Sequence, residues 1–206
     1  MISKNLHTLV NEMIFSEILK SPKIIDAFTV VDRKYFVPCA LAEHTYTDVP
    51  LSIGNKQTIS QPSTVAFMLE HLDVQGGDTV LDIGSGSGWT TALLCHLTGE
   101  EGSVTGLERV EALVEQGKVN LSKIHTHDHC CIKRAEEALG MPGEQFDKIL
   151  VSASAEEIPE TLFLQLKVGG TLVIPVGKSI FKFKKLSETH IEKEEFYGFV
   201  FVPLIV

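Results

Sequence analysis

The sequence predicts an α/β fold built on a doubly wound, mostly parallel β-sheet. Two observations support this class. From about Thr79 onward, short apolar runs typical of strands alternate with stretches of helical periodicity. The first of these runs, at 80–83, leads directly into a glycine-rich loop with a helical pattern behind it. Strands that alternate with helices in this way form parallel sheets with helices packed on their faces.

The first third of the chain is predicted to be an N-terminal helical extension. Apolar residues from Leu6 to Ile14 recur at helical spacing, and a second such pattern follows Pro22. Residues 46–62 are polar and loop-like, and 64–72 forms a further predicted helix. With 206 residues, the chain suits one domain over 1–206. We expect it to consist of a helical and substrate-loop region (1–75) and a ligand-binding α/β core (76–206).

The core elements follow from the alternation. Strands are predicted at 80–83, 103–108, 130–133, 148–151 and 171–175, and helices at 89–97, 111–124 and 159–166. Phe199 and Phe201 alternate with other residues near the C-terminus, so 196–206 is expected to close the sheet as an antiparallel strand.

Charge and cysteine usage restrict the class of partner. The chain has 27 acidic and 18 basic residues and a formal net charge of −9, which argues against a nucleic-acid partner. Its four cysteines lack CxxC spacing and its eight histidines lack HExxH spacing, so we expect no metal site. Neither a signal peptide nor a membrane-spanning run is recognisable. These features predict a cytoplasmic protein with reduced thiols and no membrane partner.

The glycine-rich loop indicates a bound nucleoside cofactor. Residues 82–88 read DIGSGSG, whereas dinucleotide enzymes use GxGxxG, whose third glycine would fall at Trp89. S-adenosylmethionine has no pyrophosphate to hold at a helix N-terminus, so the GxGxG spacing favours it over a nicotinamide cofactor. Glu108 ends the next predicted strand, where a carboxylate can accept both ribose hydroxyls. The plainer alternative is a strand-to-helix turn with a solvated Glu108.

Further motifs resemble one family. They are RKYFVP (33–38), YTDVPLSIG (46–54) and QTISQP (57–62), followed after the loop by FDKILVSASAEEIP (146–159) and LKVGGTLVIPVG (166–177). Their order and spacing resemble the protein-L-isoaspartate O-methyltransferases, S-adenosylmethionine-dependent enzymes with a Rossmann-like fold that esterify damaged aspartyl residues. The resemblance covers roughly residues 20–205, and QTISQP is its most specific part.

The resemblance implies a role for individual residues. Ser60 matches the family's active-site serine. The residues implied to hold S-adenosyl-L-methionine, and its product S-adenosyl-L-homocysteine, come from four segments: Gln57, Thr58 and Ile59; Gly84, Ser85, Gly86, Ser87 and Gly88; Glu108 and Arg109; and Glu136. Arg33 and Asp48 are assigned to the scaffold, and Trp89 to packing.

The implied chemistry needs no general base. An isoaspartyl carboxylate, with a reference pKa of about 4, is ionised at neutral pH and can attack a sulfonium methyl group directly. Catalysis then depends on orientation, and the Ser60 hydroxyl is expected to aim the acceptor. A turn serine before Gln61 and Pro62 is the structural alternative. Residues 152–155 (SASA) replace the Asn/Asp-Pro-Pro-aromatic motif of many amine methylases, which argues against an amine acceptor.

Two segments depart from the family pattern. The family has Gly-Asp-Gly where this chain has Ala135, Glu136 and Glu137, so Glu136 is expected to replace the aspartate that holds the adenine amine. Residues 178–185 (KSIFKFKK) are more basic than usual and predict either an amphipathic strand or a surface for an acidic partner.

The sequence thus predicts a monomeric carboxyl methyltransferase that repairs isoaspartyl sites in proteins and peptides. Two alternatives stay open: a diverged methyltransferase with another acceptor, and a catalytically silent S-adenosylmethionine-binding module.

Overall fold

The computed structural model describes residues 5–124 and 127–204. Its helices and short 3-10 helices are α1 (Leu6–Phe15), α2 (Pro22–Val30), η1 (Arg33–Tyr35), η2 (Cys39–His44), α3 (Pro62–Leu72), α4 (Trp89–Thr98), α5 (Glu111–Leu121) and α6 (Thr161–Leu164). Its strands are β1 (Leu51–Gly54), β2 (Gln57–Ile59), β3 (Thr79–Ile83), β4 (Ser103–Glu108), β5 (Cys130–Arg134), β6 (Phe146–Val151), β7 (Leu166–Val176), β8 (Ser179–Ser187) and β9 (His190–Tyr197).

The main sheet has seven strands in the order β5-β4-β3-β6-β7-β8-β9. The first five are mutually parallel, while β8 and β9 run antiparallel to their neighbours. The chain leaves β3 toward β4 on one side and later returns to β6 on the other, so the strand order reverses between β3 and β6. This confirms the predicted doubly wound, mostly parallel α/β sheet with an antiparallel end, and ligands bind at such a reversal.

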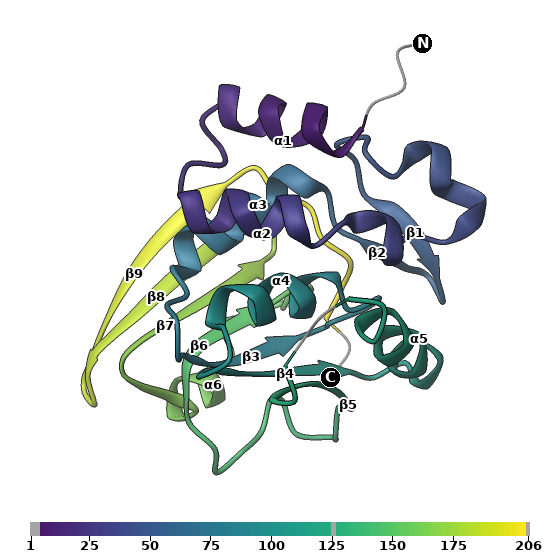
Figure 1. Ribbon diagram of the computed structural model, residues 1–206. Helices are drawn as coiled ribbons and strands as arrows, with labels where there is room; N and C mark the ends of the chain where they lie inside the picture. The colour runs from purple at the N-terminus through teal and green to yellow at the C-terminus, as the bar shows by residue number, and fades with distance from the viewer. Residues whose placement is uncertain (1–4, 125–126, 205–206) are drawn as a thin grey trace.

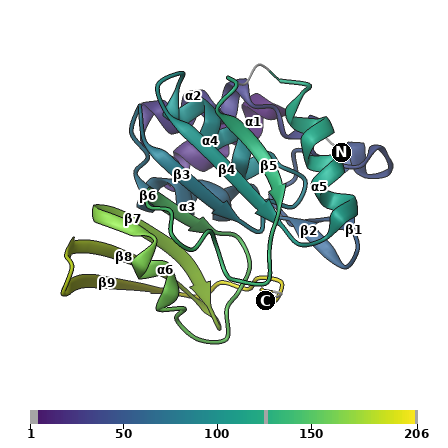
Figure 2. The same cartoon turned by 90° about the horizontal axis from the view of Figure 1, so that it is seen from below.

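The two faces of the sheet are covered differently (Figures 1 and 2). Helices α3, α4 and α5 pack on one face, and the N-terminal helices α1 and α2 lie over α3 and α4. The short α6 lies on the opposite face, which is otherwise covered by loops. The apolar cluster on the helical side runs from Leu9 and Phe28 through Leu93 to Val173, so residues 1–75 and the α/β core share buried contacts.

The predicted N-terminal helices are confirmed, but the predicted loop at 46–62 also contains a small antiparallel hairpin. Strands β1 and β2 pair around Asn55 and Lys56, and both residues have positive φ, at 52° and 60°. Two such residues form the tight turn whose twist matches that of paired strands. The sequence signal was weak because only Asn55 is a residue that commonly adopts this conformation.

The end of the chain differs from the prediction. The closing antiparallel strand is β9, which pairs with β8. It spans His190–Tyr197, whereas the sequence predicted a strand over 196–206. After Tyr197 the chain leaves the sheet, and the two phenylalanines at 199 and 201 pack on the apolar core from an irregular segment. Residues 205 and 206 lie outside the described part. The alternation of Phe199 and Phe201 did not distinguish a strand from this irregular segment, because in either case every second side chain packs on the core.

The region around α6 was also predicted incompletely. The expected helix at 159–166 is the short α6, Thr161–Leu164, and the expected strand at 171–175 extends to β7, Leu166–Val176. The basic segment 178–185 forms most of β8, as the amphipathic interpretation predicted. Three of its lysines have partners within the protein: Lys182 pairs with Glu194, Lys184 donates to Gly169 O, and Lys185 donates to Leu166 O and pairs with Glu188. These contacts disfavour its interpretation as an open basic surface.

The prediction of reduced thiols is contradicted by a disulfide between Cys95 in α4 and Cys130 at the start of β5. The two cysteines are 35 residues apart in the sequence, and the fold brings their Cα atoms to 6.1 Å. Spacing could not reveal this pair because contact between α4 and β5 exists only in the folded chain. Cys39 and Cys131 are free.

Within residues 5–124 and 127–204, no helix is both long and apolar enough to cross a bilayer.

Candidate functional site

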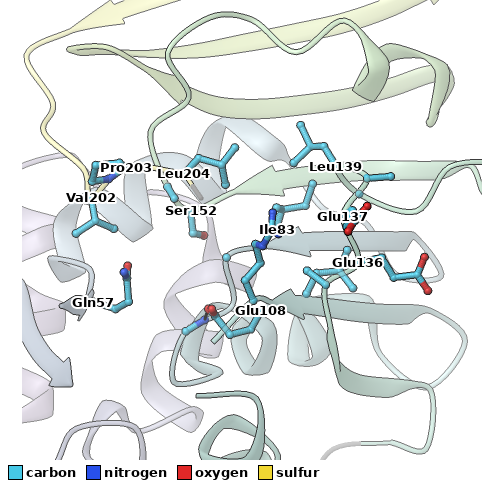
Figure 3. Close-up of a pocket in the computed structure, with 18 of the residues that line it drawn as sticks. Gln57, Ile83, Glu108, Glu136, Glu137, Leu139, Ser152, Val202, Pro203 and Leu204 are labelled. Atoms are coloured by element: carbon cyan, nitrogen blue, oxygen red, sulfur yellow. Dashed lines mark hydrogen bonds between the residues drawn. The ribbon is translucent and has the colours of Figure 1, made fainter. Parts of the chain in front are cut away.

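A cleft opens at the carboxyl ends of β3, β4, β5 and β6, where the strand order reverses (Figure 3). It encloses about 700 Å³ of space free of protein atoms, open solvent at its mouth included. Pockets for small molecules and cofactors usually measure about 300–1,000 Å³. The cleft is therefore large enough for a nucleoside-sized ligand. All four segments that the sequence assigned to the cofactor contribute to its lining, although Ile59, Ser85, Ser87 and Gly88 do not themselves line it.

The glycine loop forms one edge of the cleft. Gly84 has φ of +83°, and a Cβ on it would lie 3.7 Å from the Ala153 side chain on the neighbouring segment. Gly86 has φ of +53°, and a Cβ there would approach the Ile53 side chain of β1 to 3.2 Å. Both residues line the cleft, and side chains at these positions would narrow it. At Gly84 and Gly86 the loop therefore presents backbone atoms without side chains to the cleft.

Glu108 fixes this loop from the end of β4. One carboxylate oxygen accepts a hydrogen bond from the Gly86 amide and the other from the Val110 amide, both at 2.9 Å. The Gly86 amide is therefore occupied by a carboxylate rather than available to a phosphate. Glu108 also lines the cleft, and a carboxylate has further lone pairs to which ribose hydroxyls can donate.

The far wall of the cleft is acidic. Glu136 and Glu137 follow β5 and line the cleft beside Glu108, with Arg109 as the basic residue among its lining. In Figure 3, Glu136 and Glu137 lie at the opposite end from Gln57. Three carboxylates in one cleft favour a cationic ligand with hydroxyl or amine donors over a diphosphate.

A buried glutamine holds this wall in place. Gln165, at the end of α6, accepts a hydrogen bond from the Met141 amide at 2.7 Å and donates to Leu139 O at 2.9 Å. A Cβ on Gly140 would lie 2.2 Å from the Gln165 Oε1 atom. The loop at 139–141 therefore packs against Gln165 with no space to shift toward it.

The segment after β9 completes the cleft. Val202, Pro203 and Leu204 contribute to its lining. Ser154 anchors this segment: its amide donates to Val202 O, and its carbonyl accepts from the Leu204 amide, both at 2.8 Å. The sequence missed these three as site residues because their position depends on a return of the chain across the whole sheet.

Ser60 faces two smaller hollows that adjoin the cleft. The inner hollow lies under the glycine loop and is lined by Ser60 together with Ile59, Ser85, Ser87 and Thr90, among others. The outer groove runs from Ser60 to Pro50, Thr64 and Val200. Ser60 does not line the main cleft, whereas its neighbours Gln57 and Thr58 do. It therefore lies where the glycine loop meets a surface groove.

A buried arginine holds Ser60 in this position. Arg33 is fully buried and donates to the carbonyl oxygens of Thr45 at 2.7 Å, Val49 at 3.1 Å and Ser60 at 2.9 Å. Its guanidinium also lies 5.3 Å from the centre of the Trp89 ring. Burial lowers the pKa of Arg33 to about 10, so the group stays charged at neutral pH. Arg33 thus ties three segments of the N-terminal region together, in agreement with its assignment to the scaffold.

Asp48 and Trp89 also support the scaffold. Asp48 accepts hydrogen bonds from the Ser63 amide at 2.8 Å and the Gln61 side chain at 3.1 Å, which caps the start of α3 directly after Ser60. Trp89 was expected to pack its helix against the sheet; it belongs to the apolar cluster that includes Val80 of β3, and it also packs edge-on against Phe28 of α2.

A buried carboxylate lies beneath the inner hollow. Asp82 accepts hydrogen bonds from Thr90 at 2.8 Å, Thr91 at 2.7 Å and Ser152 at 3.4 Å. Burial raises the pKa of Asp82 to about 6, although these hydroxyl groups counteract the shift. Nearby, the buried Ser85 hydroxyl has no hydrogen-bond partner in the described protein. The inner hollow is therefore rich in hydroxyl groups, and one of them has an unused hydrogen-bonding capacity.

Every predicted site residue except Gly88 lines the cleft or one of the two hollows. Gly88 lines neither the cleft nor the two hollows, because it caps α4 and packs against Gly117 and Ile132 of neighbouring elements. Conversely, Ser152 lines the cleft and both hollows, although the sequence used residue 152 only as part of a missing motif. Its place directly after the predicted strand at 148–151 was the signal that would have found it, because ligands bind at the carboxyl ends of such strands.

The fold and the cleft define the class of S-adenosylmethionine-dependent methyltransferases. A family model described as protein-L-isoaspartate(D-aspartate) O-methyltransferase (PCMT) matches residues 4–206. The chain belongs to this family, as the motifs predicted.

Individual relatives agree with the family assignment. A protein-L-isoaspartate O-methyltransferase of Trichlorobacter lovleyi is 41% identical over 96% of this chain and 91% of its own length. One from Ignicoccus hospitalis is 36% identical over 96% of this chain and 95% of its own length. A crystal structure of a Plasmodium falciparum PCMT in complex with S-adenosyl-L-homocysteine superposes with a TM-score of 0.82 at 26% identity, over 98% of this chain and 99% of that one.

Proposed function

We propose that this chain transfers the methyl group of S-adenosylmethionine to the side-chain carboxylate of L-isoaspartyl residues in damaged proteins and peptides. In this proposal Ser60 orients the acceptor. Gln57, Thr58, Ile59, Glu108, Arg109, Glu136 and the glycine loop hold the cofactor. The position of Ser60 carries the proposal, because it lies where the glycine loop meets an open groove.

The cleft residues fit this cofactor. Its sulfonium and ammonium groups are cationic, and Glu108, Glu136 and Glu137 place three carboxylates along the cleft. Glu108 suits the ribose hydroxyls, and Glu136 suits the adenine amine, because a carboxylate accepts from each of these donors. The unpartnered Ser85 hydroxyl provides a further polar contact below the loop.

The division into cleft and groove matches a two-substrate reaction. When bound, S-adenosylmethionine supplies an electrophilic methyl group on sulfur. The groove beside Ser60 is lined by Pro50, Thr64, Val200 and Phe201, so it offers a partly apolar track for a peptide next to the reaction point. Because the acceptor carboxylate is already ionised at neutral pH, the chain has to hold it in line rather than deprotonate it.

Ser60 is placed for that role. Its carbonyl is held by Arg33, and Asp48 caps the helix that begins two residues later. With the backbone fixed on both sides, the hydroxyl can donate to one carboxylate oxygen while the other remains free to attack. Removing one such donor typically costs roughly 10²–10³-fold in rate where charge is stabilised, and less where the donor only orients.

The oligomeric state and location stay predictions. We propose a monomer acting on protein substrates. The cytoplasmic location predicted from the sequence is weakened by the Cys95–Cys130 disulfide, because such bonds are rare in reducing compartments.

The test is transfer of radiolabelled methyl groups from S-adenosylmethionine to an isoaspartyl peptide and to its normal aspartyl twin. We expect base-labile label on the isoaspartyl peptide alone. Ser60→Ala should lower this transfer by at least about tenfold. Ser52→Ala, in the same hairpin but exposed and outside the hollows, should leave it unchanged.

Two outcomes would contradict the proposal. Cofactor binding without label on either peptide would move the assignment to a different acceptor or to a silent binding module. Full activity of Ser60→Ala would leave the reaction in place but remove Ser60 from it.

A further inference from the structure

Ser152 occupies a position that the residues discussed so far do not explain. It follows β6, and its amide donates to Ile83 O at 2.8 Å, which continues the β3–β6 pairing by one step beyond the strand. Its backbone is therefore fixed at the carboxyl edge of the two central strands, beside Gly84. In Figure 3 its side chain lies between Gln57 and Val202 on one side and Ile83 on the other.

The position gives Ser152 access to both substrates. Among the residues that line the cleft, the inner hollow and the outer groove, only Thr58 and Ser152 face all three spaces. Ser60 faces two of them, the inner hollow and the groove, and Ser152 shares both. A group that passes from the cofactor cleft to an acceptor in the groove must cross the space that these side chains border.

The Ser152 hydroxyl is also weakly held. It donates to Asp82 Oδ1 at 3.4 Å, which is long for a hydrogen bond between oxygen atoms. Thr90 and Thr91 donate to the other oxygen, Oδ2, at 2.8 Å and 2.7 Å, so they bind Asp82 tightly. Rotating the Ser152 hydroxyl away from Asp82 therefore gives up only a weak hydrogen bond, and a ligand carboxylate at a shorter distance would form a stronger one.

We propose that Ser152 is a second acceptor-binding residue, whose hydroxyl donates a hydrogen bond to the acceptor carboxylate in addition to that of Ser60. This inference rests on the proposed function. Together the two donors fix the plane of the carboxylate as well as its distance.

The proposal predicts a particular kinetic pattern. The acceptor oxygen loses negative charge as the new bond forms, so a donor to the carboxylate binds the ground state at least as strongly as the transition state. Losing it should raise KM for the peptide more than it lowers kcat. A hydrogen bond to a charged group corresponds to roughly ten- to a hundredfold in kcat/KM.

The experiment compares Ser152→Ala and Ser152→Thr with the unmodified chain on the isoaspartyl peptide. S-adenosylhomocysteine affinity is measured by calorimetry and thermal stability by melting. We expect Ser152→Ala to lower kcat/KM at least about tenfold, mainly through KM, with S-adenosylhomocysteine affinity within about twofold of the unmodified value. Ser152→Thr, which keeps the hydroxyl, should restore most of the activity. Ser122→Ala removes a hydroxyl that donates to Val119 O, far from the three spaces, and should have no effect.

The outcomes separate this inference from the proposed function. An unmodified chain that methylates the peptide, combined with an unchanged KM for Ser152→Ala, would overturn the role of Ser152 alone. An equal loss of S-adenosylhomocysteine affinity would also overturn it, because Ser152 would then serve the cofactor. An unmodified chain that binds cofactor but leaves the isoaspartyl peptide unlabelled would overturn both.

Discussion

The two sides of the site are built by different means. The cofactor side is built mainly from backbone: parallel strands lie in register, and their loops are fixed by the side chains of Glu108 and Gln165. On the acceptor side, formed by the N-terminal region, the buried Arg33 guanidinium binds the carbonyl oxygens of Thr45, Val49 and Ser60, and Asp48 caps the start of α3. A backbone framework distributes its stabilisation over many bonds, whereas the acceptor side concentrates it in a few side-chain contacts, most of them made by Arg33. Substitutions in the two regions should therefore differ in size and in what they affect.

The largest effect is expected for Arg33→Met. The substitution keeps similar volume but removes the donor from the carbonyl oxygens of Thr45, Val49 and Ser60, in one buried and two partly buried hydrogen bonds. Each lost hydrogen bond to a charged group costs roughly 1.5–3 kcal/mol, and because two of the three are partly exposed we expect the lower end for three bonds, about 4.5 kcal/mol in the free energy of unfolding, measured in urea. Variant protein that remains folded should bind S-adenosylhomocysteine but methylate peptide poorly.

Arg134→Met is the control for this prediction. Arg134 forms an exposed ion pair with Glu111, and such pairs contribute about 0–1 kcal/mol. If Arg33→Met were no more destabilising than Arg134→Met, the acceptor side would have to be held by other contacts.

A smaller effect should distinguish two neighbouring glycines on the cofactor side. Gly88 has φ of +90°, and a Cβ there would lie 2.9 Å from Ile132 Cδ1 and 3.2 Å from Gly117 O. Gly88→Ala should therefore lower the free energy of unfolding by roughly 2–3 kcal/mol through strain and overpacking, and the protein that remains folded should bind S-adenosylhomocysteine normally.

Gly86→Ala should act differently, because Gly86 lines the cleft and meets only the Ile53 side chain at 3.2 Å. We expect a clear loss of S-adenosylhomocysteine affinity in calorimetry with a smaller loss of stability. Equal losses of affinity in both variants would return Gly88 to the set of cofactor-binding residues.

The smallest effect concerns Asp82 and pH. Its pKa is raised by burial from 3.8 to about 6, so the folded protein binds a proton that the unfolded chain releases between these values. The resulting stabilisation is complete below pH 3.8 and is lost as the pH rises through about 6. Asp82→Asn removes this dependence, so relative to the unmodified chain it should gain on the order of 2 kcal/mol in stability between pH 4 and pH 8.

Asp147→Asn provides a control of opposite sign. Burial alone would raise the pKa of Asp147, but hydrogen bonds from Lys167 and the Thr79 amide lower it overall. Asp147 therefore stabilises the fold at neutral pH, and this contribution is lost as the pH falls through its native pKa. Urea unfolding curves at several pH values should show Asp82→Asn and Asp147→Asn diverging in opposite directions. Parallel curves would contradict the assigned role of burial at Asp82.

The same contrast between backbone and side chains explains what the sequence could predict. The alternation of strands and helices, the glycine loop and Glu108 are local patterns; the alternation predicted the sheet correctly, and Gly84, Gly86 and Glu108 do line one cleft. Contacts between distant segments have no local pattern. Three features depend on packing between such segments: the Cys95–Cys130 bond, the hydrogen bond from Arg33 to the Ser60 carbonyl, and the position of Ser152 at the border of three spaces. Gly88 was assigned to the cofactor by spacing, and spacing alone cannot separate a glycine that meets a ligand from one that packs against a neighbouring helix, as Gly88 does against Gly117.

The segment from Val202 to Leu204 also links the site to protein synthesis. These residues line the cleft, and Val202 also lines the outer groove, although the glycine loop is made more than a hundred residues earlier. A ribosome must therefore translate past Leu204, and that stretch must leave the exit tunnel, before the cleft has its full wall. The sheet can begin to form on the growing chain, but the complete site exists only after Leu204 has emerged.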